Sequence, residues 1–151
     1  MIEIFTDGAS RGNPGPGGYG VVLKYKQHRK ELTEGFRLTT NNRMELLAVI
    51  KALEAIKGEG QQIMIYTDSQ YVVKAVSQGW LWNWMKKNFK GKKNEDLWRR
   101  FANVYKKHQV QFKWLKGHAG HVENEYCDQL AVQSALGGML KADEGYESQP
   151  S

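Results

Sequence analysis

The chain has 151 residues and a formal net charge of +6, with 25% charged and 40% hydrophobic residues. This length predicts one domain that buries roughly two thirds of its unfolded surface. A single cysteine, Cys127, excludes an internal disulfide and a cysteine-rich zinc module, and it favours a cytoplasmic protein. The longest apolar runs fall far short of the ~20 residues of a membrane span, and no signal-peptide pattern opens the chain.

The first predicted strand, residues 2–7 (IEIFTD), ends on Asp7 and runs into a stretch rich in glycine and proline. That stretch fits GxGxxG from Gly15 to Gly20, the pattern of a dinucleotide-binding loop. Such a loop needs glycines that open a helix, whereas residues 19–25 show the period-two alternation of a strand. The glycines are therefore predicted to form a turn between two strands.

A third strand at residues 32–38 completes a predicted antiparallel meander. Beyond it, helices alternate with strands, which implies parallel crossovers and an α/β fold with a mixed sheet covered on both faces. The remaining predicted elements are a helix within 39–60, a strand at 63–67, helices at 69–79 and 94–108, a strand at 110–116 and a helix at 123–136. Residues 1–137 are thus assigned to one domain, and residues 138–151 to a largely disordered tail.

Most of the positive charge lies in residues 85–107, where nine Lys and Arg side chains face two acids, a net charge of +7. The rest of the chain is therefore about neutral. A concentrated basic segment is typical of a protein that binds a polyanion such as nucleic acid. The alternative is a solvated helix face with no ligand.

Two strands share the pattern IxI[F/Y]TD, at residues 2–7 and 63–68, and each ends on an aspartate, Asp7 or Asp68. Matching strand ends suggest carboxylates that project from the same sheet edge, where open α/β sheets place their ligands. Two further acids, Glu45 and Asp128, are candidates for the same crevice. Each acid also has a structural alternative: Asp68 as a helix cap, or Glu45 in a capping box with Asn42.

If the four acids converge, like charges ~4 Å apart repel by about 4 kcal/mol per pair at an effective dielectric near 20. A divalent cation relieves this repulsion, and ligands that are all oxygen favour Mg²⁺ or Mn²⁺ over zinc. Two such ions promote phosphodiester hydrolysis, a reaction that also gives the basic segment a substrate to hold.

Histidines in KGHAGHVENEYCD (116–128) raise the alternative of a zinc site. His118, His121 and Cys127 supply at most three local ligands and no HExxH motif is present, so structural or peptidase zinc is not favoured. His118 is a candidate proton carrier or an aid to product release, and an ordinary loop histidine is the alternative.

Four stretches occur in order: FTDGASRGNPGPGGYG (5–20), TTNNRMEL (39–46), YTDSQYV (66–72) and KGHAGHVENEYCD (116–128). Together they closely resemble type 1 ribonuclease H of the bacterial kind, over about residues 2–137. The resemblance implies a five-stranded mixed sheet, with strands 1–3 antiparallel, strands 4 and 5 parallel to strand 1, and helices on both faces. It also implies endonucleolytic cleavage of the RNA strand of RNA/DNA hybrids, leaving 5′-phosphate and 3′-hydroxyl ends.

The resemblance implies catalytic roles position by position: metal-binding acids at Asp7, Glu45, Asp68 and Asp128, and a mobile histidine at His118. The implied cofactor is Mg²⁺, with Mn²⁺ as a substitute and no small-molecule cofactor. Amide side chains suited to base edges and to the 2′-hydroxyl are implied hybrid contacts, at Asn13, Asn41, Asn42 and Gln70.

GWLWNWMKKNFKGKKNEDLW (79–98) resembles the basic protrusion of that family, at about residues 80–95, which grips the DNA strand. Trp80 and Trp84 share a helical face and are expected to pack and to shape the binding surface. Lysines expected to meet phosphates are Lys86, Lys87, Lys90, Lys92 and Lys93. The expected partner is an RNA/DNA hybrid bound by a monomer, with no membrane involved.

Other functions stay open beside this one. A DNA-directed nuclease of the same fold shares the sheet and the carboxylates, and the TTNNRMEL and SQYV amides argue against it. A catalytically silent hybrid-binding module is a second alternative, against which the intact acids argue. A basic amphipathic ligand of membranes or calmodulin is a third, although its helix would be embedded in a globular domain.

Overall fold

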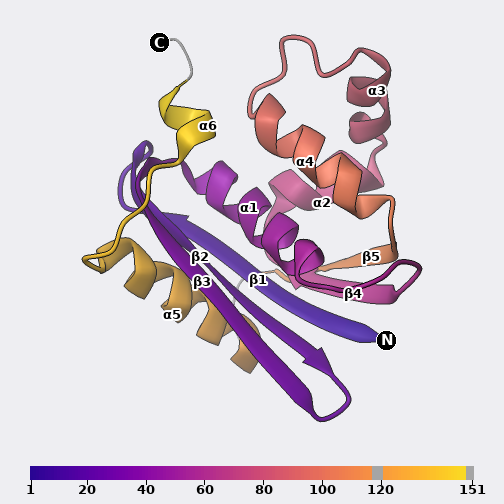
Figure 1. The fold of residues 1–151 in the computed structure, drawn as a ribbon, viewed down its shortest axis with the longest axis horizontal. Helices are drawn as coiled ribbons and strands as arrows, with labels where there is room; N and C mark the ends of the chain where they lie inside the picture. Colours follow the sequence, from indigo (N-terminus) through magenta and orange to yellow (C-terminus); the bar gives the residue numbers. More distant parts are fainter. Residues whose placement is uncertain (117–120, 149–151) are drawn as a thin grey trace.

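The structure, a computed structural model, describes residues 1–116 and 121–148, and the five strands in this part form a mixed sheet (Figure 1). The strands are β1 (Ile2–Ser10), β2 (Gly15–Tyr25), β3 (His28–Thr39), β4 (Gln62–Thr67) and β5 (Gln109–Trp114). Their order in the sheet is β3-β2-β1-β4-β5. β1 pairs with β2, and β2 with β3, in antiparallel fashion, whereas β1–β4 and β4–β5 are parallel. The predicted fold class is confirmed.

Helices cover both faces of the sheet (Figure 1). They are α1 (Asn41–Glu54), α2 (Gln70–Ser77), α3 (Trp80–Lys86), α4 (Glu95–Tyr105), α5 (Val122–Leu136) and α6 (Glu144–Glu147). α5 packs against β1, β2 and β3 on one face, while α1 packs against β1 and β2 on the other and carries α4 on its outer side. None of the helices in the described part of the chain is long and apolar enough to span a membrane.

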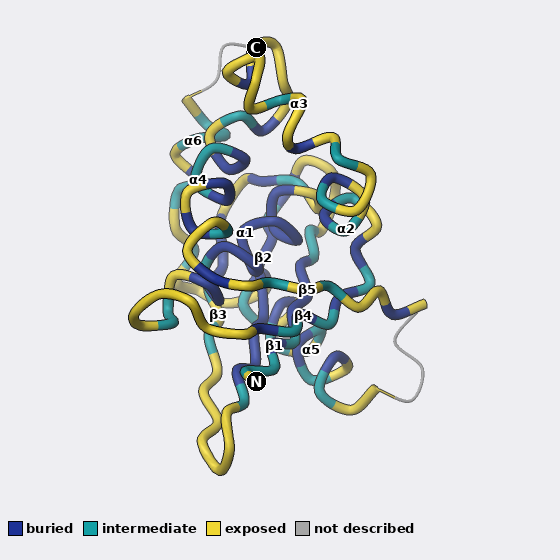
Figure 2. The backbone as a smooth tube through the Cα atoms, turned by 90° about the vertical axis from the view of Figure 1, so that its right-hand side faces the viewer, coloured by how far each residue is buried: buried dark blue, intermediate teal, exposed yellow. Residues whose placement is uncertain are grey.

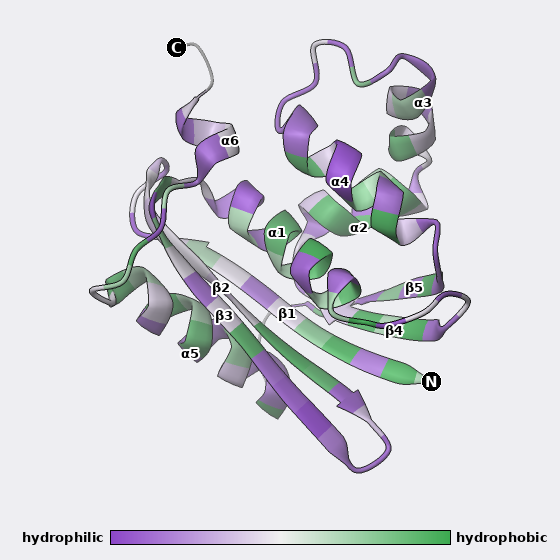
Figure 3. Ribbon diagram, in the orientation of Figure 1, coloured by the Kyte–Doolittle hydropathy of each residue, from purple (hydrophilic) through white to green (hydrophobic). Residues whose placement is uncertain are grey.

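The hydrophobic core lies between the sheet and α1 and continues outward to α4 (Figure 2). α1 is buried on nearly all sides because it is sandwiched between the sheet and α4. Large side chains that are fully buried include Ile4 and Ile65 from the sheet, Leu46 from α1, and Trp98 and Phe101 from α4. The distal part of the β2–β3 hairpin extends beyond this core and is strongly hydrophilic (Figure 3).

Glycines in the first two strands let the helices approach the sheet closely. A Cβ atom at Gly8 would overlap the backbone of Met44 and Glu45 in α1, and one at Gly20 would overlap the backbone of Cys127 in α5. Residues Gly15 to Gly20 form the first part of strand β2, so the turn predicted over these residues is wrong. The pattern misled because glycine permits close backbone approach as well as turns.

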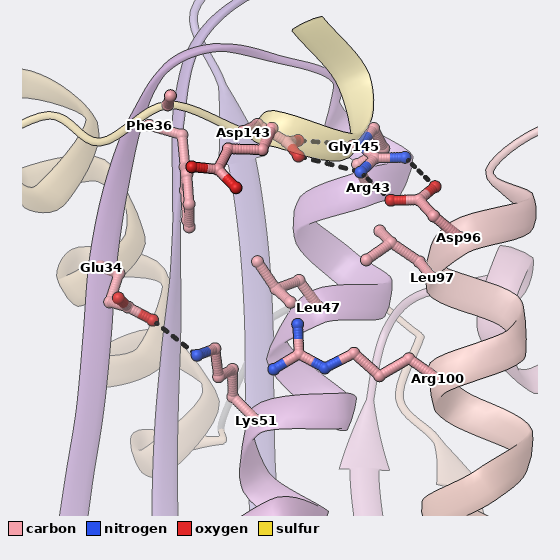
Figure 4. A pocket seen from close by; sticks show the side chains of 12 residues that line it. Glu34, Phe36, Arg43, Leu47, Lys51, Asp96, Leu97, Arg100, Asp143 and Gly145 are labelled. Atoms are coloured by element: carbon pink, nitrogen blue, oxygen red, sulfur yellow. Dashed lines mark hydrogen bonds and ion pairs between the residues drawn. The ribbon is translucent and has the colours of Figure 1, made fainter. Parts of the chain in front are cut away.

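Part of the predicted disordered tail packs against the domain (Figure 4). The backbone of Lys141 bonds with that of Gly35 and Arg37 in β3, at 2.9 Å in both cases, and α6 follows. Asp143, 7% exposed, accepts hydrogen bonds from Nε and Nη2 of Arg43 at 2.8 and 2.9 Å. The expectation of disorder is therefore wrong for residues 141–147, which pair with β3, supply Asp143 as a partner of the buried Arg43 and form α6. Residues 149–151 lie outside the described part.

Candidate active site

Three of the four predicted acids meet at one edge of the sheet. Asp7 lies near the end of β1, Asp68 directly follows β4, and Glu45 lies in the second turn of α1. β1 and β4 are parallel and pair Ile2 with Ile63, so the same offset along both strands brings Asp7 opposite Asp68. One carboxylate oxygen from each acid lies within 4.8 Å of the other two. We refer to these three residues as the acid cluster.

Glu45 is held against β1 by the backbone of Gly8. The Gly8 N–H donates to Oε1 of Glu45 and also to Oδ1 of Asp7, the latter at 2.9 Å. The first turn of α1 is capped by Thr40, whose side chain accepts from the backbone N–H of Arg43 at 3.2 Å. Because the cap is Thr40 and not Asn42, the capping-box interpretation of Glu45 is wrong.

The acid cluster is electrostatically strained without a cation. Burial raises the pKa of the Glu45 carboxyl well above its ordinary value, and the negative charge of Asp7 beside it raises the pKa further. Asp7 is 4% exposed and Glu45 is 6% exposed, so water provides little screening for either group. Three oxygen ligands at this spacing fit a hard divalent cation such as Mg²⁺, whose charge would favour the ionised carboxylates.

Asp128 lines the same cleft, which has a volume of about 500 Å³, but it lies outside the compact acid cluster. It occupies the second turn of α5 and is half-buried. The structure thus brings the fourth predicted acid to the cleft without placing its carboxylate at the spacing of the other three. His118, the predicted catalytic histidine, lies outside the described residues.

The predicted amide contacts surround the acid cluster. Asn41, Asn42 and Gln70 all line the cleft and are exposed. Asn13 lies beside them, because its side-chain oxygen accepts a hydrogen bond from the backbone N–H of Asn41 at 3.2 Å. The four amides therefore share one surface with the carboxylates, although they come from three separate parts of the chain.

A second groove separates the cleft from the protrusion formed by α3 and the loop after it. Asn42 and Tyr71 border it on one side, and its other lining residues are Trp80, Trp84, Gly91, Lys92, Lys93 and Asn94. The ring centroids of Trp80 and Trp84 lie 6.4 Å apart, and Nζ of Lys92 lies 4.4 Å from the Trp84 ring centroid. Both predicted tryptophans thus line this groove.

Three predicted phosphate contacts stand away from that groove. Lys86, Lys87 and Lys90 are exposed on α3 and the following loop, and none of them lines the groove. Lys92 and Lys93 line it instead. Positive charge therefore lies both in the groove and outside it, and the groove adjoins the cleft of the acid cluster, since Asn42 and Tyr71 line both hollows.

Sequence reasoning missed two aromatic residues of this region. The hydroxyl of Tyr71 accepts hydrogen bonds from Nδ2 of Asn94 and Nε1 of Trp98, each at 2.9 Å, which joins α2 to α4. Trp114, the last residue of β5, lines the cleft with the acids. The sequence did hold a signal for Trp114. It lies at the end of a predicted strand, as Thr67 does just before Asp68, and the ends of parallel strands meet at the same edge of a sheet.

Comparison with known proteins gives a consistent result. The sequence matches the RNase H family over residues 1–136. A ribonuclease H of Desulforamulus reducens is 58% identical over 147 residues, covering 94% of this chain and 92% of that one. A ribonuclease H of Shewanella sp. is 51% identical over 152 residues, covering 97% and 95%.

Solved structures show the same likeness in three dimensions. LC9-RNase H1, a type 1 RNase H with the type 2 active-site motif, gives a TM-score of 0.81 at 30% identity, covering 98% of this chain and 81% of that one. LC11-RNase H1, solved in complex with an RNA/DNA hybrid, gives a TM-score of 0.66 at 25% identity, covering 90% and 97%.

Proposed function

This chain belongs to the RNase H family, and we propose that it hydrolyses the RNA strand of RNA/DNA hybrids as an endonuclease at the acid cluster. The observation that carries the proposal is the meeting of Asp7, Glu45 and Asp68 within 4.8 Å of one another beside a cleft lined by amides. Its relatives of known fold support the substrate, because one of them was solved with a hybrid bound.

The acid cluster is the proposed site of two divalent ions, Mg²⁺ or, as a substitute, Mn²⁺. When bound, these ions supply an activated water and stabilise the leaving oxygen of the scissile phosphate. Asp7, Glu45 and Asp68 would hold the ions by their carboxylates, and Asp128, which lines the same cleft, would supply a further carboxylate. The water oxygen bonds to phosphorus as the P–O3′ bond breaks, which leaves a 5′-phosphate and a 3′-hydroxyl.

Proton movement and substrate choice are assigned to other side chains. His118 is proposed, from the family resemblance, to carry a proton or to assist product release. Amide side chains at the cleft would hydrogen-bond base edges and 2′-hydroxyls of the RNA strand, which selects RNA over DNA at this position. The residues proposed for this role are Asn13, Asn41, Asn42 and Gln70.

The protrusion is proposed to hold the DNA strand. Its groove combines the rings of Trp80 and Trp84 with the ammonium groups of Lys92 and Lys93, a surface that suits sugar and phosphate. Lys86, Lys87 and Lys90 would add a sequence-independent attraction. A single chain carries both the acid cluster and this groove, so a monomer suffices for the proposed reaction.

End-labelled RNA/DNA hybrid, duplex DNA and duplex RNA, each incubated with Mg²⁺ or with EDTA, test the proposal. We expect cleavage of the RNA strand of the hybrid with Mg²⁺, and no cleavage with EDTA. Asp7→Asn should bind the hybrid yet cleave it at least about 1,000-fold more slowly, since metal catalysis contributes several kcal/mol. Equal cleavage of duplex DNA would reject the substrate, and an active Asp7→Asn variant would reject the site.

A further inference from the structure

Trp114 is a large apolar side chain in an unusual place. It ends β5, which is an edge strand of the sheet, and it is 41% exposed. It does not belong to the hydrophobic core that joins the sheet to α1 and α4. Instead its ring forms part of the wall of the cleft that contains the acid cluster.

The backbone ladder between β4 and β5 ends just before Asp68. The last paired residues are Thr67 and Trp114, and the last backbone hydrogen bond runs from the N–H of Leu115 to the carbonyl of Thr67, at 2.8 Å. Asp68 is therefore the first residue beyond the ladder. The indole Nε1–H of Trp114 donates to the backbone carbonyl of Asp68 at 3.1 Å. A side chain thus adds one more rung where the backbone pairing has ended.

Asp68 differs from the other acids of the cluster in how its backbone is held. Asp7 lies inside the β1–β2 ladder, paired with Gly20, and Glu45 lies inside α1. Asp68 lies in the two-residue link between β4 and α2. Within that link, the N–H of Ser69 donates to Oγ1 of Thr67 at 3.1 Å, a contact between near neighbours in sequence. The bond from Trp114 ties the link to a separate strand.

We propose that Trp114 is a positioning residue, whose indole N–H fixes the Asp68 peptide and so holds the Asp68 carboxylate within the acid cluster. The proposal rests on the proposed function, because it takes the cluster to be the metal site. When the Asp68 peptide is fixed, its carboxylate loses less conformational entropy as an ion binds. Hydrogen-bond partners of metal ligands raise the metal affinity of a site through such positioning. Binding of the hybrid through the protrusion does not depend on this bond.

The direct test is the affinity of the hybrid-free protein for Mn²⁺, measured from the loss of the free-ion EPR signal. Trp114→Phe keeps an aromatic ring, although a smaller one, and removes the N–H donor. It should weaken Mn²⁺ binding about three- to tenfold, the effect of one neutral hydrogen bond. Trp82→Phe is the matched control: Trp82 is 45% exposed, packs at a tilt against the Tyr105 ring and does not line the cleft. It should bind Mn²⁺ as the wild type does.

Kinetics separate positioning from a purely structural role. With Trp114→Phe, the Mg²⁺ concentration for half-maximal cleavage should rise by the same factor, while KM for the hybrid at saturating Mg²⁺ stays unchanged. A lower Tm with an unchanged Mn²⁺ affinity and Mg²⁺ midpoint would overturn the proposal. If the wild type itself binds no Mn²⁺, the proposed metal site fails, a result distinct from equal binding by wild type and variant.

A measurement on the wild type covers the case of a variant that does not fold. In ¹⁵N–¹H spectra, the indole proton of Trp114 should exchange with water more slowly than that of Trp82, although the two rings are similarly exposed. Addition of the diamagnetic ion Mg²⁺ should shift the Trp114 indole signal and leave the Trp82 signal in place. Equal exchange and no shift would overturn the proposal.

Discussion

At the scale of single residues, Glu45 shows the conflict between stability and the proposed chemistry. Its carboxyl is buried beside Asp7, and both circumstances raise its pKa. Without metal, the folded state must either keep a proton on this carboxyl at neutral pH or keep two buried negative charges close together. When a metal ion is bound, the same two carboxylates can both serve as its ligands.

Glu45→Gln is therefore expected to stabilise the metal-free protein by about 1–2 kcal/mol at pH 7, since the amide removes the charge and its oxygen still accepts from Gly8. Urea unfolding in EDTA measures this. The exposed Glu125→Gln on α5 is the control and should change the free energy of unfolding little. Loss of stability in Glu45→Gln under EDTA would show that the cluster is not strained without a cation.

The matching strand ends and the family resemblance indicated the acids, whereas the roles of their neighbours needed coordinates. Two aspartates after matching strands implied a shared edge, and the structure brings them together with Glu45. Sequence could not reveal that Gly8 donates to both Asp7 and Glu45, because that bond depends on how closely α1 approaches β1. The bond from Trp114 to Asp68 likewise depends on where the β4–β5 ladder ends.

At the scale of elements, the C-terminal segment holds the first turn of α1 in place. Arg43 is completely buried and lies between Asp143 and Asp96, so α1, α4 and the segment before α6 meet at one guanidinium (Figure 4). Asp143 also accepts from Oγ1 of Thr39 at 2.6 Å. Glu45 is two residues beyond Arg43, so this junction supports the helix that carries an acid of the cluster.

Asp143→Ala should lower the free energy of unfolding by about 3 kcal/mol, because it leaves the buried Arg43 charge with one of its two carboxylate partners. Urea unfolding at pH 7 measures the loss. Glu147→Gln is the control, since Glu147 pairs with Arg37 at an exposed site and should matter little. Equal effects of the two substitutions would contradict a structural role for the buried junction.

The protrusion is the second element with a testable role. Lys92→Ala combined with Lys93→Ala should flatten the salt dependence of hybrid binding by about 1.4–1.8 in the log–log slope, if each contacts one phosphate. Lys106→Ala with Lys107→Ala changes the net charge equally at the far end of α4 and is the matched control. Slopes that fall equally in both pairs would indicate general attraction without a defined groove.

The salt dependence of hybrid binding by a variant with Lys86→Ala, Lys87→Ala and Lys90→Ala tests the role of the exposed lysines. Lys86, Lys87 and Lys90 were predicted as phosphate contacts, and they remain a prediction, since they lie outside the groove. The sequence marked the charge of the protrusion correctly, because lysine runs are visible in the chain. It could not show which lysines line the groove, because that depends on the path of the backbone between α3 and α4.

At the scale of the whole molecule, ion pairs between distant segments predict sensitivity to acid. Burial alone would raise the pKa of Asp96, but hydrogen bonds and charge from Arg43 outweigh it and lower the pKa. Glu34 behaves likewise: burial raises its pKa, and bonds from Lys141 and Tyr19 reverse the shift. A carboxylate whose pKa is lowered by folding stabilises the protein above its unfolded pKa and loses that effect as the pH falls.

The ordinary pKa values are 4.5 for Glu34 and 3.8 for Asp96. We therefore expect the free energy of unfolding to decrease as the pH falls below 4.5, and to go on decreasing below 3.8. Asp96→Asn should show a shallower decrease than the wild type over this range. Urea unfolding at a series of pH values gives both curves. Parallel curves would mean that the Arg43–Asp96 ion pair contributes nothing to the loss of stability at low pH.

The overall fold could be predicted from the sequence, but the docking of the C-terminal segment onto it could not. Period-two strands, capped helices and four ordered motifs predicted the mixed sheet, because these are local patterns. The docking of the C-terminal segment was missed because its anchor is a pair 100 residues apart, Arg43 with Asp143, in a tail whose composition is polar. The role of Gly18 and Gly20 was missed for the same reason, because the helix that approaches them, α5, lies at the other end of the chain.

The proposed function depends most on the acid cluster being a divalent metal site. Crystals soaked in MnCl₂ and measured for anomalous scattering test this directly. We predict an anomalous peak between the carboxylates of Asp7, Glu45 and Asp68, at coordination distance from an oxygen of each, and its absence in crystals of Asp7→Asn. Well-ordered carboxylates with no peak among them, or Mn²⁺ bound only elsewhere, would contradict the account.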